Sequence, residues 1–441
     1  MSRFEPISVT RRGFLSAAGA FAGAVGVAGC GSGSLGAAGS RSAGSPLTYS
    51  GVTDKSWTAR AQGDIAAFQA TNPGFTVKYS GFDERQYQDE ALRLAVSGLG
   101  PGLLWYWITA RFQDVVASHA ALDLSDVWAG SMKDVRPATV DWYRDSGAKH
   151  YAVPLDIGFY PILFYNKSIF GRLGVAPPPA DTRAWSEDEL FHACKTFRRA
   201  GLIPWALPGN SLSAHVAEAI AVSSMPQDVL QHYTVEAWKP GSEYQYTDAA
   251  WRNVFDTVDR WSRHKVFEPK SGDVNQIQAH DLFVQGKAAM VSGGAWTIAD
   301  LKSTPGAPDF DWMLFPSVSE PSKLLVYVGT GAFISAAAAT RDEAKEFLKF
   351  MLRPERLMVA AQKYNQIPGV NLPGLDEVLD PRVAAMVEFS QRNGITGVNW
   401  ATEIDVAFGA AAKGVIAGTT TADQAVNDME IAGRQSRARL Q

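Results

Sequence analysis

The sequence has little cysteine, no basic excess and no long apolar run beyond its first thirty residues. Its 2 cysteines in 441 residues exclude a framework of several disulfide bridges. Its formal net charge of -4 at pH 7 excludes the strongly basic face that binds nucleic-acid phosphates. No later apolar run approaches the length of a transmembrane helix. What remains is a globular composition, 46% hydrophobic and 20% charged.

Signatures of known catalytic sites are also missing. Gly286-Lys287 is followed by Ala288 and lacks the upstream glycine of a phosphate-binding loop. No two histidines have metal-ligand spacing; the isolated ones are His192, His215, His232, His264 and His280. We therefore expect no enzyme, no metal and no cofactor. A secreted carbohydrate-active enzyme stays open as an alternative, because its two carboxylates could come from any of 45 acidic residues.

The first thirty residues have the pattern of an export signal. Arg11-Arg12 precede an uncharged, mainly apolar stretch from Gly13 to Gly29, which is too short for a permanent membrane span. The paired arginines look like a twin-arginine signal. Val27-Ala28-Gly29-Cys30 resembles a lipobox, in which the cysteine is acylated. We expect residues 1–29 to be a signal and Cys30 to anchor the chain to the outer face of the cell membrane. The alternative is an ordinary signal with a stray cysteine.

The remaining chain is expected to form a tether and two lobes. Residues 30–46 are rich in Gly, Ser and Ala, which predicts a flexible tether. The part after residue 46 exceeds one comfortable hydrophobic core, which predicts two lobes. Cys194 lies on an apolar helix face, so we expect a buried thiol.

The N-terminal part alternates short strands and helices. Strands are expected at Leu47–Tyr49, Phe75–Tyr79 and Leu103–Ile108, and helices follow the first two, one capped by Asp54 and one over about 85–97. This alternation predicts an α/β fold with a parallel sheet covered on both faces.

Helix starts can be predicted further along the chain. Ser186 with Glu189, and Thr340 with Glu343, have the spacing of a capping box. Asp248 is expected to cap a helix with an aromatic stripe that includes Trp251.

Four segments, in order, form a pattern that extends over much of the chain. The first runs from Tyr151-Ala152-Val153-Pro154 through Tyr165-Asn166-Lys167 to Trp185. The second is Phe283–Met290 followed by Gly294 and Trp296. The third is Val328–Ser335, and the fourth, weaker one is Ile367-Pro368-Gly369. Together these segments resemble the extracellular solute-binding proteins of carbohydrate ABC importers. Gly102 departs from the pattern, because family members usually have an acidic residue after the equivalent of Pro101.

The resemblance implies a two-lobed periplasmic-binding-protein fold, with hinged lobes that are each a mostly parallel sheet flanked by helices. Crossovers are expected near Asp156–Phe159, Met290–Gly293 and Ala336–Thr340. Lobe 1 would then comprise residues 47–157 plus 291–338, and lobe 2 residues 158–290 plus 339–441.

The resemblance also implies the function. It predicts a monomeric, lipid-anchored protein that binds a sugar, amino sugar or oligosaccharide between its lobes and delivers it to ABC permease subunits in the membrane. The same fold binding a glycerophosphodiester is one alternative. A lipid-anchored sensor or scaffold is another. A phosphate ligand would require cationic side chains or a helix terminus, and the matched segments contain few arginines.

Candidate ligand-binding residues follow from what a sugar presents. Its apolar face stacks on aromatic rings, and its hydroxyls need fixed donors and acceptors. Trp105 and Trp107 end the third strand and share one face, although both could instead cover the core. Trp296 follows two glycines and matches a tryptophan of the family. Further candidates are Asp83, Asp156, Phe159, Asn210, Gly329, Thr330, Gly331, Tyr364 and Asn365. For Asp156, a hinge salt bridge is the alternative role.

Overall fold

The computed structural model describes residues 46–97, 100–108, 110–132, 149–209, 212–268, 271–396 and 400–439. Cys30, the expected signal, nearly all of the expected tether and Asn210 lie outside these described residues. Within the described part, none of the helices combines the length and apolarity that crossing a membrane requires.

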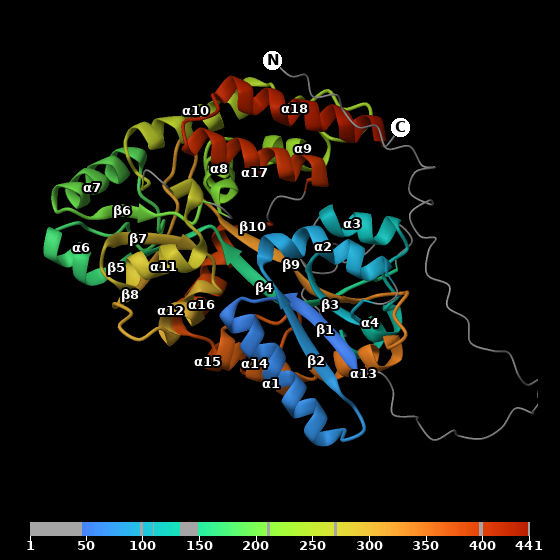
Figure 1. Ribbon diagram of the computed structural model, residues 1–441. Coiled ribbons are helices and arrows are strands. Elements are labelled where there is room, and N and C mark those ends of the chain that lie inside the picture. The colour runs from blue at the N-terminus through green and yellow to red at the C-terminus, as the bar shows by residue number, and fades with distance from the viewer. Residues whose placement is uncertain are drawn as a thin grey trace, which may run out of the picture. The chain divides into compact units, whose positions relative to one another are not determined.

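The first sheet has six strands and a mixed arrangement. Its path is β10 (Gly394–Thr396), β9 (Leu324–Ile334), β3 (Leu103–Trp107), β1 (Leu47–Val52) and β2 (Val77–Phe82), and β4 (Val153–Tyr160) pairs with the other edge of β9. Strand β1 is parallel to β2 and β3, and β10 is parallel to β9. Strands β3 and β4 are antiparallel to β9. Figure 1 shows β1, β2 and β3 side by side.

Among the residues that the structure describes, six helices accompany this sheet. They are α1 (Lys55–Thr71), α2 (Glu84–Val96), α3 (Ala110–Ala117), α4 (Ser125–Ser131), α13 (Arg341–Met351) and α14 (Pro354–Tyr364). Asp54 caps α1 as expected, because its carboxylate accepts hydrogen bonds from the N–H groups of Ser56 and Trp57. Buried side chains of the sheet and these helices, such as Tyr49, Leu104 and Phe347, share one core. We call this sheet with its helices the six-stranded lobe.

The second sheet has four strands, in the order β6 (Ile203–Ala206), β7 (Ala288–Gly293), β5 (Ile162–Asn166) and β8 (Phe310–Leu314). The β6–β7 pair is parallel, whereas β5 is antiparallel to both β7 and β8. Every residue of β5 and β7 is buried. The accompanying elements are α6 (Lys167–Leu173), α7 (Glu187–Arg199), η1 (Ser271–Asp273), α11 (Gln276–Val284), α12 (Thr297–Ser303), α15 (Leu375–Val378) and α16 (Pro381–Asn393).

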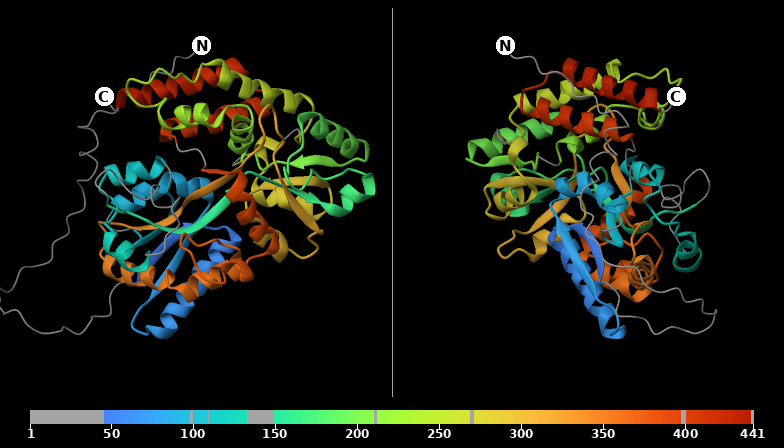
Figure 2. Two further views of the ribbon diagram at one scale, coloured as in Figure 1. Left: turned by 180° about the vertical axis from the view of Figure 1, so that it is seen from behind. Right: turned by 45° about the vertical axis from the view of Figure 1, so that its right-hand side comes forward.

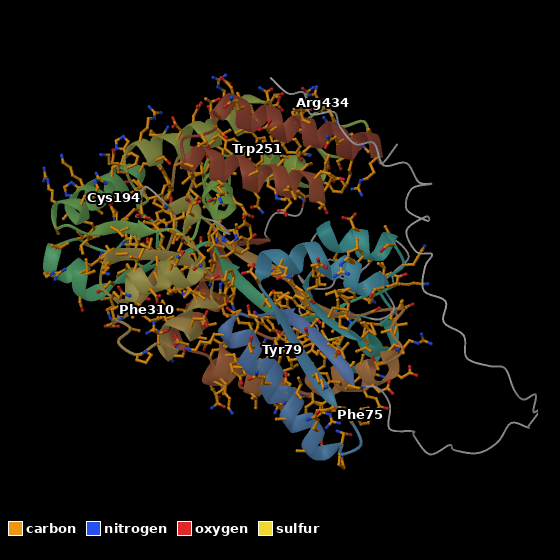
Figure 3. All side chains as sticks on the ribbon, viewed as in Figure 1. Phe75, Tyr79, Cys194, Trp251, Phe310 and Arg434 are labelled. Carbon is orange, nitrogen blue, oxygen red and sulfur yellow. The ribbon has the colours of Figure 1, made fainter. Side chains whose placement is uncertain are left out.

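A layer of helices shares the core on one side of this sheet. It comprises α8 (Ser213–Val222), α9 (Gln227–Val235), α10 (Ala249–Arg263), α17 (Thr402–Ile416) and α18 (Ala422–Arg439). Helices α17 and α18 pack side by side, as Figures 1 and 2 show. Trp251 of α10, labelled in Figure 3, is fully buried against Trp400 and Phe408. The second sheet and all these helices form the four-stranded lobe.

The two sheets are joined through the antiparallel pair of β4 and β9. The chain passes directly from β4 in the first sheet to β5 in the second. It returns from β8 to β9 through residues 315–323. Strand β4 is buried along its whole length. The crossover expected near Asp156–Phe159 therefore lies at the end of β4, close to the predicted position.

The sheet assignment differs from the expected lobe boundaries in two places. Residues 291–323 include part of β7, α12 and β8, which belong to the four-stranded sheet and its core. Helix α13 packs against β1, β3 and β9, so it belongs with the six-stranded sheet. Strand β7 and helix α13 each have an apolar pattern that could be buried in either lobe. The sequence therefore did not indicate which sheet each of them joins. The expected crossovers at 290–293 and 336–340 are therefore wrong.

Three further expectations need correction. The four-stranded sheet is not mostly parallel, because β5 runs opposite to both its neighbours. The capping box at Ser186 and Glu189 is present, but Thr340 makes no capping hydrogen bond although it occupies the N-cap position of α13. Asp248 likewise precedes α10 without a capping bond, since its carboxylate accepts instead from Tyr233 and Gln245.

These two N-cap positions give a matched pair of variants. We expect Ser186→Ala to lower the free energy of unfolding by about 1 kcal/mol, because the N–H of Glu189 loses its acceptor. We expect Thr340→Ala to lower it by only a few tenths of that amount, because no capping bond is lost. Urea unfolding of both variants measures the difference, and equal losses would contradict the assignment of the two caps.

Candidate functional site

Three predicted residues form a row across three strands of the six-stranded sheet. Trp107 of β3 lies opposite Thr330 of β9, and Thr330 lies opposite Asp156 of β4. The next residue of β9, Gly331, lies between Tyr106 and Pro154. Gly329 precedes Thr330 in β9. The row stands where the parallel strands β1, β2 and β3 end, and this edge of an α/β sheet is where ligands usually bind.

Asp83 belongs to the same edge. It directly follows β2, its side chain is exposed, and its carbonyl accepts the Tyr87 N–H at 2.8 Å in the first turn of α2. The structure therefore brings Asp83, Trp107, Thr330 and Asp156 to one region of the sheet, although they are far apart in sequence.

The tryptophans of β3 have different exposures. Trp105 is 3% exposed, whereas Trp107 is partly exposed. Their rings meet edge to face with centroids 4.6 Å apart, which confirms that they share one face of the strand. Trp57 of α1 packs on Trp105 at 5.2 Å. Trp105 is thus a buried support, and Trp107 is the ring of the pair that can offer a surface.

The indole Nε1 of Trp105 is buried, and no described residue accepts a hydrogen bond from it. A buried donor of this kind normally finds a partner in the protein or in ordered water.

Asp156 is held in the pair of strands that joins the two sheets. Its Oδ1 accepts the N–H of Ile367 at 2.6 Å, and its residue is 8% exposed. Burial raises the pKa of Asp156 to about 7, and the nearby Arg60 guanidinium opposes this rise. The carboxyl group therefore changes charge near neutral pH. The expected alternative, a hinge salt bridge, is not found within ion-pair distance among the described residues.

A buried polar network behind Asp156 was not predicted from the sequence. Arg60 of α1, 2% exposed, donates through Nη1 to the Leu155 carbonyl at 3.2 Å and to Oε1 of Gln366. Its Nε lies 3.5 Å from Asp64, which also pairs with Arg356 of α14. Arg60 and Asp64 have the i, i+4 spacing of a helix ion pair, and this was the signal that could have found them.

Tyr364 and Asn365 have structural contacts in the segment after α14. The Tyr364 hydroxyl donates to the Ala59 carbonyl at 3.2 Å. Asn365 ends α14 with a φ of 54°, a left-handed conformation that asparagine tolerates, and its Oδ1 accepts the N–H of Asp380 at 3.2 Å. Both residues fasten this segment to neighbouring elements, and Ile367 bridges it to β4.

Trp296 follows the end of a strand of the four-stranded sheet, and Phe159 of β4 contacts the same turn. Strand β7 ends at Gly293, and Trp296 immediately precedes α12 with a partly buried ring. A Cβ on Gly294 would lie 2.1 Å from this ring, so a larger residue there would displace the ring of Trp296. Phe159 is 3% exposed, and its carbonyl accepts the Ala295 N–H at 2.9 Å. Phe159 therefore supports the turn that presents Trp296.

A second polar group at this edge was also missed. The Tyr160 hydroxyl donates to Oε1 of Glu218 at 2.9 Å, and the His215 ring lies 4.7 Å from the Tyr160 ring. Burial lowers the pKa of His215 to about 4, so this ring is neutral at pH 7. His215 and Glu218 lie on α8, which follows the end of β6. A position just after a strand is a common place for ligand-binding residues, and this was the sequence signal that could have identified His215 and Glu218.

The arrangement supplies aromatic faces and hydrogen-bonding groups. Trp107 and Trp296 are partly exposed rings at the edges of two different sheets. Both lobes also carry carboxyl groups, those of Asp83 and Asp156 in one lobe and that of Glu218 in the other. Within the described ranges, no group of three His, Cys, Asp or Glu side chains could hold a metal ion. These groups suit a ligand with apolar ring faces and many hydroxyls.

Comparison with known proteins gives three findings. A sequence model described as bacterial extracellular solute-binding protein matches residues 54–356. An uncharacterised ABC transporter extracellular-binding protein of Pyrococcus horikoshii is 23% identical over 337 residues, which cover 74% of this chain and 72% of that protein.

Solved structures of two other proteins have a similar fold. A chitin oligosaccharide binding protein matches with a TM-score of 0.77 and 18% identity, over 90% of this chain and 100% of that one. The GacH receptor of Streptomyces glaucescens, solved unliganded and with acarbose, matches with a TM-score of 0.74 and 19% identity, over 90% of this chain and 99% of that one.

The likeness of these structures confirms the expected two-lobed α/β fold. The matched family consists of binding proteins, which agrees with the expectation that the chain is not an enzyme. Because the model covers well over half of the sequence, the chain belongs to the family of bacterial extracellular solute-binding proteins.

Proposed function

We propose that this protein is the substrate-binding component of an ABC importer and binds a sugar, amino sugar or oligosaccharide between its two lobes. The observation that carries the proposal is the placement of Trp107 and Trp296. Each is a partly exposed tryptophan at the edge of a different sheet, and the two sheets are joined by β4 and β9. Rotation about this connection would close both rings on one ligand.

The chemistry around these rings supports a hydroxylated ligand. A pyranose ring stacks on a tryptophan face, and its hydroxyls donate to carboxylates and accept from N–H groups. The buried Nε1 of Trp105 and the carboxyl groups of Asp156 and Glu218 are groups of this kind. The chitin oligosaccharide binding protein and the acarbose-bound receptor with the same fold support the same ligand class.

A glycerophosphodiester is the second candidate, but the charges near the tryptophans do not favour it. Among the side chains that the structure describes, the charged groups named at the two edges are the acidic Asp83, Asp156 and Glu218. The guanidinium of Arg60, behind Asp156, is buried and already bonded to Leu155 and Gln366. A phosphate ligand needs unopposed donors or cations.

Closure explains how binding would be reported to a permease. Ligand shifts the open and closed forms only through better contacts in the closed one. The closed form would present the surface that the permease subunits recognise. We propose that the protein acts as a monomer in this cycle.

Acylation of Cys30 is proposed as the anchor that keeps the protein at the outer face of the membrane, with residues 30–46 as tether. We expect the mature N-terminal peptide, isolated from cells that export the protein, to begin at Cys30 and to carry acyl mass. Cys30→Ser should release the protein from the membrane fraction. A mature N-terminus elsewhere, or an unmodified cysteine, would refute the anchor.

Thermal unfolding of the chain with Cys30→Ser tests the ligand class. We expect a higher melting temperature with maltotriose, chitotriose or another saccharide, because a ligand that binds only the folded form stabilises it. The screen includes glycerophosphodiesters as competing candidates. Stabilisation by these alone would overturn the sugar proposal, and so would release of reducing ends from any saccharide.

Two variants then test the aromatic contacts. Trp107→Ala and Trp296→Ala should each weaken binding of the identified saccharide by about 1–3 kcal/mol, or roughly 5- to 150-fold in Kd, by analogy with aromatic–base stacking. Trp238→Ala is the matched control, because Trp238 is also partly buried but follows α9, where its Nε1 donates to the Thr234 carbonyl. Unchanged Kd in both site variants, measured by calorimetry, would remove the stacking argument.

The raised pKa of Asp156 predicts a pH dependence of stability. The folded-state pKa of about 7 exceeds the ordinary value of 3.8, so the folded form binds the proton more tightly. The stabilisation of the folded form by this proton is fully present below about pH 4 and is lost as pH rises through about 7. Between pH 4 and 8, we expect the melting temperature of Asp156→Asn to change less with pH than that of the wild type. The variant Asp181→Asn, at an exposed position, is the control. If the melting temperatures of the wild type and Asp156→Asn changed in parallel with pH, the raised pKa of Asp156 would be contradicted.

A further inference from the structure

Four side chains link α3 to the first turn of α17 and the last turn of α18. Both carboxylate oxygens of Asp114 on α3 are occupied: Thr402 donates to Oδ2 at 3.0 Å, and Arg439 donates to Oδ1 at 3.2 Å. The same guanidinium reaches Glu403, with Nε 3.1 Å from Oε1. We call Asp114, Thr402, Glu403 and Arg439 the α3–α18 cluster.

The cluster connects two separate hydrophobic cores. Phe112 and Val115 of α3 are buried in the core of the six-stranded lobe. Ile404 and Phe408 of α17, and Met429 of α18, are buried in the core of the four-stranded lobe. Asp114 and its partners are 288 and 325 residues apart in sequence. The contact therefore ties one lobe to the other outside the β4–β9 connection.

The charges in the cluster alternate in sign. Asp114 lies next to Thr402, the first residue of α17, where the helix N-terminus favours a negative charge. Glu403 brings a second carboxylate, in the same first turn. Arg439 is the cation that pairs with both. Without it, a carboxylate of one lobe would face a carboxylate of the other.

We propose that the arrangement in which these four side chains meet is the closed form, and that the α3–α18 cluster is a latch between the lobes that stabilises this form, raises ligand affinity and slows ligand release. The inference rests on the hinge closure of the proposed function. It assigns to the C-terminal helix α18 a part in that closure, through Arg439 at its end.

The exposure of the cluster sets the size of the effect. The side chains of Arg439, Asp114 and Glu403 are 49%, 35% and 29% exposed. Ion pairs this exposed add little to the free energy of folding and are screened by salt. The balance between open and closed forms is much finer than folding, so the same pair shifts it by about two- to five-fold.

The variants differ in a predictable order. Arg439→Gln should open the lobes more than Asp114→Asn, because it leaves Asp114 and Glu403 unneutralised across the contact. Arg434→Gln is the matched control. It removes the same charge from an exposed position on the same helix, which Figure 3 labels, and touches none of the four residues. Arg437 is unsuitable, because it pairs with the buried Glu430.

Distances between two spin labels in the full chain, without ligand, test the latch. The spin labels are attached to cysteines that replace Val96 on α2 and Ile431 on α18, in the Cys30→Ser background. These two positions are 49% and 47% exposed. Cys194 is buried and is not labelled. Pulsed electron paramagnetic resonance should show longer distances in Arg439→Gln and, to a smaller extent, in Asp114→Asn. It should also show a shift of the unmutated pair toward longer distances in 1 M NaCl.

Identical distance distributions in Arg439→Gln, Asp114→Asn and the unmutated chain would overturn the latch. Equal lengthening in Arg434→Gln would do so too, since it would show a general charge effect. Unchanged melting temperatures separate opening from unfolding. Because this measurement uses no ligand, it is independent of the saccharide screen. The latch can fail while maltotriose or chitotriose binds, and it can hold while every saccharide fails.

Discussion

The antiparallel pair of β4 and β9 is the constraint on which the rest of the structure depends. Strand β4 continues into β5 of the other sheet, and β9 receives the chain back from β8. Hydrogen bonds between them keep Asp156 opposite Thr330, and the next strand places Trp107 in the same row. The pair thus fixes one half of the proposed site and also forms the connection about which the other half would move.

Rigid and movable parts of the site are stabilised in different ways. Trp105, Phe159 and the Arg60–Gln366 network are almost fully buried, and their loss would destabilise the lobe to which each belongs. Trp107 and Trp296 keep part of their rings exposed. Two polar, partly exposed contacts outside the strands also join the lobes, at Asp114 and between Lys55 and Ser303 at 2.8 Å. They are weak enough to break and form again.

Local signals in the sequence predicted local structure well. The cap at Asp54, the capping box at Ser186 and the strands β1 and β3 were all predicted from neighbouring residues. The sheet that contains β7 was not predicted, because an apolar strand pairs equally well in either lobe. The partnership of Arg60 and Gln366 spans 306 residues and has no local pattern. Thr340 shows that cap spacing alone does not ensure the capping bond. The resemblance to a family identified Trp296, whereas the end of the third strand identified Trp105 and Trp107. Burial then separated Trp105 from Trp107.

The central claim is that the two sheets rotate about β4 and β9 when a saccharide binds. Small-angle X-ray scattering of the chain with Cys30→Ser, with and without a saturating saccharide, measures this most directly. The account predicts a smaller radius of gyration in the bound state, because the lobes approach each other while each keeps its own core. Saturated binding with an unchanged scattering profile would contradict it.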